Sequence, residues 1–258
     1  MAVSETSRIF EDSLLVVGFF CAFVNLYDRN RMQFKPVTHV IFDMDGLLLE
    51  SESAYERILG SMTEKFGKQY TLDIKLKVLG TAEPETASII IRECQLPISH
   101  EEFLVEYRAK MKEELKNPML MPGAEKLVEH LSKKGVPIAV ATSSSMDSYE
   151  IKTQNHRNLF KYFNHVVCAS SDPEVEHGKP APDIFLVCAS RFPDKPSASK
   201  CLVLEDAPNG VKGALAAGMQ AVLVPAEEVS DELRKPATLV IKSLEDFKPE
   251  LFGLPPFE

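Results

Sequence analysis

From residue 37 onward, short apolar segments alternate with helical patterns, and this alternation constrains the fold more than any other feature of the chain. The predicted strands are short, apolar and partly β-branched, and they cover residues 39–42, 137–142, 165–168, 201–205, 221–224 and 239–241. A helical pattern such as "PNGVKGALAAG" follows one of them and stops at Gly218, a typical helix C-cap. Alternating strands and helices predict an α/β fold, a Rossmann-like parallel sheet with helices on both faces.

Residues 51–120 interrupt this alternation. They contain no convincing strand, but apolar residues recur at helical spacing, for example at Leu104, Tyr107 and Met111. A helical insert of this length between the first two strands predicts a small separate cap domain. We therefore expect a core of residues 37–50 and 121–258 and a helical cap of residues 51–120.

Residues 1–36 precede the predicted fold. The apolar block 14–24 has the length of a signal-peptide core, but its flank carries three acidic residues against one arginine, and no small-residue cleavage site follows. The block is also shorter than the ~20 apolar residues of a spanning helix. We expect an extension outside the fold and no stable membrane span, with a targeting or anchoring role as the alternative.

The overall charge and the cysteine pattern exclude several classes of protein. A net charge of −9 gives no electrostatic footprint for nucleic acid and does not favour an anionic membrane surface. The five cysteines are scattered, odd in number and without CxxC spacing, which indicates neither a disulfide framework nor a zinc site. A reducing compartment fits best, so we expect a cytoplasmic protein.

Polar side chains stand where four of the predicted strands end. They are Asp43 and Asp45, Thr142 and Ser143, Lys179, and Glu205 and Asp206. Each group alone is common in turns and helix caps, but ligands of parallel sheets bind beyond the carboxyl ends of the strands, where all four would meet. Carboxylates suit Mg²⁺, hydroxyl and amide groups at a helix start hold phosphate oxygens, and an ammonium neutralises a transferring group. The set predicts a site for phosphoryl transfer.

The segments "DMDG", "VATSS", "GKPAPD" and "LEDAPNG" resemble, in order, the four motifs of the haloacid dehalogenase-like hydrolase superfamily. The helical insert resembles that of members with a helical cap. Within the superfamily, "SDPEVEHGKPAPDIF" and "DFKPELFGLP" look most like the pseudouridine-5′-phosphatases and their animal relatives.

The resemblance implies a role for each motif residue. Asp43 is the implied nucleophile, which forms an aspartyl-phosphate, and Asp45 is the implied general acid and base. Lys179 would steady Asp43 and, together with Thr142 and the Ser143 amide, bind the phosphate. The implied metal is Mg²⁺, and its implied ligands are Asp43, the Asp45 carbonyl and Asp206, with Glu205 as a ligand or in the outer shell.

The implied function is Mg²⁺-dependent hydrolysis of a small phosphate monoester, such as pseudouridine 5′-phosphate or another nucleoside 5′-monophosphate. We expect a monomer whose partner is a small phosphorylated metabolite. The loop "GTAEPET" at 80–86 offers Thr81, Glu83, Glu85 and Thr86 to sugar hydroxyls or a base edge. It has no Lys or Arg for a second phosphate, which counts against a phosphomutase. An inactive paralogue that only binds its ligand is the other alternative, because Glu50 stands where the family usually has aspartate.

Overall fold

The computed structural model describes residues 34–258, which fall into two units. The smaller unit contains residues 34–37 and 248–258. In it, the Phe34 ring stacks on Phe252 with centroids 4.7 Å apart, beside the short helix η3 (Pro249–Phe252). Of the predicted extension, only residues 34–36 belong to the described part of the chain. The larger unit, residues 38–247, contains the sheet and the cap.

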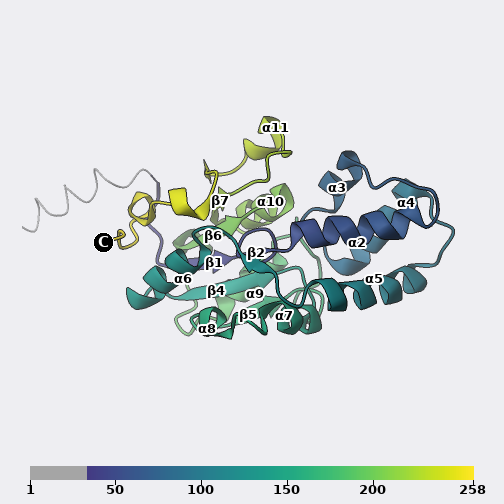
Figure 1. The fold of residues 1–258 in the computed structure, drawn as a ribbon. Helices are drawn as coiled ribbons and strands as arrows, with labels where there is room; N and C mark the ends of the chain where they lie inside the picture. The colour runs from purple at the N-terminus through teal and green to yellow at the C-terminus, as the bar shows by residue number, and fades with distance from the viewer. Residues whose placement is uncertain (1–33) are drawn as a thin grey trace, which may run out of the picture. The chain divides into compact units, whose positions relative to one another are not determined.

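A sheet of six parallel strands forms the centre of the larger unit (Figure 1). Its strands, in spatial order, are β5 (Val166–Cys168), β4 (Ile138–Thr142), β1 (His39–Phe42), β6 (Cys201–Glu205), β7 (Gln220–Leu223) and β8 (Leu239–Val240). The chain extends from β1 toward β5 and then returns to β6 on the other side. This reversal beside β1 creates the crevice in which α/β proteins bind ligands.

Helices cover both faces of the sheet. One face carries α9 (Asp183–Ser190) and α10 (Pro208–Ala216), whose apolar residues share a buried cluster with Ile41 of β1. Phe42 points to the opposite face, where its ring meets Phe163 edge-on at 5.6 Å. The predicted α/β fold is confirmed, and each predicted strand lies within one residue of an observed one.

The remaining helices of the core are short. They are α6 (Ala124–Lys133), α7 (Met146–Thr153), α8 (Arg157–Phe160), α11 (Asp231–Arg234) and the 3₁₀ turns η1 (Ala198–Lys200) and η2 (Leu244–Asp246). None of the helices between residues 34 and 258 is long and apolar enough to cross a membrane. The four cysteines in this range are buried and unpaired, whereas Cys21 lies outside it.

Four helices lie between β1 and β4, in the segment predicted to be the cap: α2 (Glu52–Glu64), α3 (Leu72–Val78), α4 (Glu83–Cys94) and α5 (His100–Glu114). They surround an apolar cluster of their own, which includes Ile58, Ile90 and Phe103. A pair of antiparallel strands that we did not predict, β2 (Leu49–Glu50) and β3 (Met119–Leu120), joins the two chain segments that lead into and out of the cap.

Candidate active site

The turn after β1 brings two carboxylates, Asp43 and Asp45, to the carboxyl edge of the sheet. The Asp43 amide extends the parallel pairing of β1 by donating to the Leu204 carbonyl at 3.0 Å. Gly46 follows with a φ of +77°, and a Cβ atom on it would lie 2.2 Å from Asp206 Oδ2. Glycine is therefore required here, both for the left-handed backbone and for the close approach of Asp206.

Asp43, Glu205 and Asp206 form a buried carboxylate cluster in which one oxygen of each lies within 4.8 Å of the others. Gly210 makes room for it, because a Cβ atom there would meet Glu205 Cδ at 1.9 Å. Burial raises the pKa of all three carboxyls. The charge of Asp45 adds to the rise at Asp43, and the charge of Asp43 adds to it at Asp206 and at Glu205, whose pKa reaches about 7. A hard divalent cation would relieve this repulsion, so the cluster suits Mg²⁺.

Lys179 joins two of these carboxylates and is only 1% exposed. Its ammonium donates to Asp43 Oδ1 and, at 3.1 Å, to the Ala141 carbonyl. It also forms an ion pair with Glu205, whose Oε1 lies 2.6 Å away. Burial alone would lower the pKa of Lys179, but Asp43 and Glu205 raise it above its ordinary value. The lysine therefore stays charged beside the predicted nucleophile.

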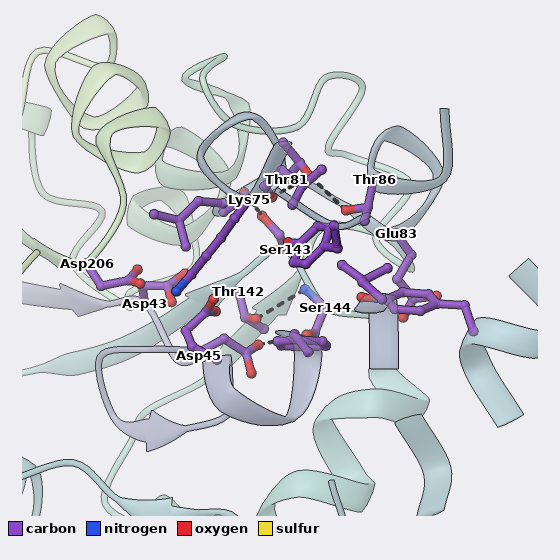
Figure 2. A pocket seen from close by; sticks show the side chains of 18 residues that line it. Asp43, Asp45, Lys75, Thr81, Glu83, Thr86, Thr142, Ser143, Ser144 and Asp206 are labelled. Atoms are coloured by element: carbon purple, nitrogen blue, oxygen red, sulfur yellow. Dashed lines mark hydrogen bonds between the residues drawn. The ribbon is translucent and has the colours of Figure 1, made fainter. Parts of the chain in front are cut away.

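The end of β4 contributes hydroxyl and amide groups to the same pocket (Figure 2). Thr142 and Ser143 line it, and the Thr142 hydroxyl accepts a 3.1 Å hydrogen bond from the Ser144 amide. The Ser143 hydroxyl donates to the Gly80 carbonyl of the cap at 3.0 Å. Thr142 and Ser143 thus line the same pocket as both aspartates, and their role in binding phosphate stays a prediction.

Asp45 has a partner that the sequence did not reveal. Its Oδ1 accepts a 2.6 Å hydrogen bond from the Ser51 hydroxyl, and its Oδ2 accepts from Ser144 Oγ at 3.0 Å and Lys152 Nζ at 2.6 Å. Burial acts to raise the pKa of Asp45, but the Lys152 charge and these hydrogen bonds lower it below its ordinary value. Lys152 was missed because a lysine on a mixed helical pattern normally indicates a solvated face.

The pocket that these groups line is small and has a second wall from the cap. Its volume is about 70 Å³, against several hundred Å³ for a typical ligand site. Tyr55, Tyr70, Lys75 and Tyr107 supply much of the cap wall. The described conformation is therefore a closed one, and the cap has to open for a metabolite to enter.

The loop at 80–86 holds the cap against the core. Glu83 accepts hydrogen bonds from Arg108 at 2.8 Å, Ser148 at 3.0 Å and Ser145 at 3.2 Å, so both of its oxygens are engaged. The Thr81 and Thr86 hydroxyls bond to each other at 2.7 Å (Figure 2). In this closed state, Glu83 joins the cap to the core through Ser145 and Ser148, and the two threonine hydroxyls pair with each other instead of facing a ligand unpaired.

Glu50 supports the first turn of α2. Its carboxylate accepts from the Ser53 amide at 3.2 Å and the Ser53 hydroxyl at 2.9 Å. The N-cap residue Ser51 makes no capping bond, because its hydroxyl is directed to Asp45. The Glu50 side chain therefore accepts from a backbone amide in the first turn of α2, a turn that the N-cap side chain of Ser51 does not cap.

Comparison with known proteins agrees with this geometry. The family model of haloacid dehalogenase-like hydrolases matches residues 37–218. A probable pseudouridine-5′-phosphatase of Drosophila melanogaster is 50% identical and covers 86% of this chain and 96% of its own. The (DL)-glycerol-3-phosphatase 2 of Arabidopsis thaliana is 45% identical over 86% of this chain and 93% of its own.

A solved structure supports the same assignment. A putative β-phosphoglucomutase from Bacteroides vulgatus is 25% identical, with a TM-score of 0.68 over 82% of this chain and 86% of its own. The predicted resemblance to one family is therefore confirmed by sequence and by fold. The chain belongs to the haloacid dehalogenase-like hydrolase family, and its enzyme class is that of a phosphoric monoester hydrolase.

Proposed function

We propose that the protein hydrolyses a small phosphate monoester in two steps that use both aspartates after β1. An Asp43 oxygen attacks phosphorus, the bond from phosphorus to the ester oxygen breaks, and Asp45 gives its proton to the leaving alcohol. Asp45 then takes a proton from a water whose oxygen attacks phosphorus, and the bond to Asp43 breaks to release phosphate. The observation that carries this proposal is the buried Lys179 held against Asp43 in a pocket that Asp45 also lines.

The lowered pKa of Asp45 fits the second step directly, because the carboxylate is then ready to accept a proton. The first step requires the acid form. An entering phosphate adds negative charge to the pocket, and a nearby like charge raises the pKa of a carboxyl. Substrate binding thus favours the protonated state that the first step needs.

Mg²⁺ is the proposed metal, held by carboxylates of Asp43 and Asp206 and the Asp45 carbonyl, with Glu205 as a further ligand or beside it. When bound, it would neutralise charge on the phosphoryl oxygens and on the clustered carboxylates. The supporting observations are the 4.8 Å spacing of the three acidic side chains and the glycines that make room for them.

For the substrate we propose a nucleoside 5′-monophosphate, with pseudouridine 5′-phosphate as the first candidate. The Drosophila relative supports it, and Tyr55, Tyr70 and Tyr107 give the cap wall aromatic rings against which a base can pack. Glycerol 3-phosphate is the second candidate, because the Arabidopsis relative is named for it and the closed pocket favours a compact molecule.

A phosphomutase activity is not favoured. Lys75 is a cap cation that lines the pocket, but its ammonium lies 3.2 Å from Glu228 and 3.4 Å from Glu56, so it is already paired. The test compares kcat/KM for pseudouridine 5′-phosphate, uridine 5′-phosphate, glycerol 3-phosphate and a hexose 1-phosphate. We expect the highest value for a nucleotide and no isomerised hexose phosphate. A hexose 6-phosphate appearing faster than free phosphate would overturn the proposal.

A further inference from the structure

We propose that Lys152 is a positioning residue for Asp45, which it holds in the orientation needed for proton transfer and joins to the cap through Tyr55. The inference rests on the proposed two-step hydrolysis. It adds a second buried lysine to the site, so that each aspartate after β1 has a lysine of its own.

The contacts of Lys152 account for all three hydrogens of its ammonium. The residue lies in α7 and is fully buried. Its Nζ donates to Asp45 Oδ2 at 2.6 Å, to Ser144 Oγ at 2.6 Å and to Tyr55 Oη at 3.0 Å. A buried ammonium is costly unless it is paired and hydrogen-bonded, and here its charge partner is Asp45.

Hydrogen bonds from three side chains fix both carboxylate oxygens of Asp45. Ser51, at the junction of β2 and α2, holds Oδ1, whereas Ser144 and Lys152 hold Oδ2 from the turn after β4 and from α7. A general acid or base has to lie within hydrogen-bond reach of the proton that moves, and a small misplacement of a reacting group is costly in rate. Removing Lys152 would leave Oδ2 held only by a serine that has itself lost a partner.

Tyr55 connects this arrangement to the cap. It belongs to α2, lines the pocket, and places its ring centroid 5.6 Å from the Lys152 ammonium. Lys152 therefore contacts both the proposed acid–base residue and a cap residue that lines the pocket. A lysine that served only to stabilise the fold would not require contact with both.

The test compares Lys152→Met with Lys161→Met on two substrates. Lys161 belongs to the sheet-containing part of the chain, is exposed to solvent and lies near the Tyr162 ring. Its variant therefore controls for the loss of a positive charge. The alkyl substrate is the best phosphate ester of the panel above, whose alcohol needs a proton to leave. The aryl substrate is 4-nitrophenyl phosphate, whose nitrophenolate leaves without one.

For Lys152→Met with the alkyl ester we expect kcat to fall about 100-fold or more and KM to change little, because general acid–base catalysis contributes about 10²–10⁴-fold. With the aryl ester we expect a burst of about one nitrophenolate per enzyme, followed by slow turnover. The burst arises because Asp43 is phosphorylated normally, whereas water attack still needs a positioned Asp45. Lys161→Met should behave as the unaltered protein.

The inference would be overturned if Lys152→Met kept its melting temperature, lost the same factor in kcat on both esters, and released no burst of nitrophenolate. If Lys152→Met does not fold, Tyr55→Phe removes one bond to Lys152 and keeps the ring. It should lower the ratio of kcat/KM for the alkyl ester to kcat/KM for the aryl ester, and an unchanged ratio would overturn the proposed link. Failure of the unaltered protein to hydrolyse any ester would instead refute the proposed function.

Discussion

Replacing Gly46 by alanine should weaken metal binding, in addition to the loss of folding stability that any side chain at a left-handed position causes. The new Cβ atom would lie 2.2 Å from Asp206 Oδ2, whereas real contacts of this kind are about 3 Å or longer, so the carboxylate has to move. A left-handed backbone also costs about 1–2 kcal/mol for a residue with a side chain. Displacing a group that orients or binds a metal typically costs about 10–100-fold in affinity or activity.

Gly135 provides a matched control. Its φ is +71°, but a Cβ atom there would meet nothing within 4 Å, so Gly135→Ala adds the backbone strain without the clash. In a denaturant titration without metal, Gly135→Ala should lose about 1–2 kcal/mol of stability, and Gly46→Ala should lose at least as much. Only Gly46→Ala should need about 10-fold or more Mg²⁺ for half-maximal activity. The same Mg²⁺ requirement in both variants would refute the placement of Asp206 at the metal.

Other perturbations test the carboxylate cluster and the cap. The raised pKa values of Asp43, Glu205 and Asp206 mean that the metal-free protein loses stability as pH rises from the ordinary carboxyl pKa of about 4 toward the value of about 7 at Glu205. Added Mg²⁺ should therefore raise the melting temperature more at about pH 8 than at about pH 5.5, and equal shifts would contradict the cluster. Glu83→Ala removes the acceptor of two hydrogen bonds from the core, those of Ser145 and Ser148, so it should favour the open cap by about 1–3 kcal/mol and raise KM; an unchanged KM would argue against the closed state as the productive one.

The strands could be predicted because each is a short, apolar and partly β-branched segment, and four of them lead to polar groups that suit a ligand site. Buried strands of a parallel sheet need that composition, and helical segments of the cap lack it. The pair β2 and β3 could not be predicted, because two residues show no alternation and each strand pairs with a segment on the other side of the cap helices.

The motif residues could be proposed from resemblance, and their roles stay predictions. The supporting contacts were not accessible from the sequence. Neither Ser51 nor Lys152 was singled out from the sequence, because spacing along the chain does not show which side chains fold back onto Asp45. Glu83 looked like a ligand for sugar hydroxyls, whereas Arg108 and two serines take up its oxygens in the closed state. Such contacts depend on the packing of cap against core.

The measurement that tests the central claim most directly is mass analysis of the protein after rapid acid quench with Mg²⁺ and a phosphate ester. We expect one phosphoryl group on the peptide that contains Asp43, and neither that adduct nor turnover in a folded Asp43→Asn variant. Hydrolysis at the normal rate by Asp43→Asn, or by the unaltered protein in excess chelator, would contradict the account.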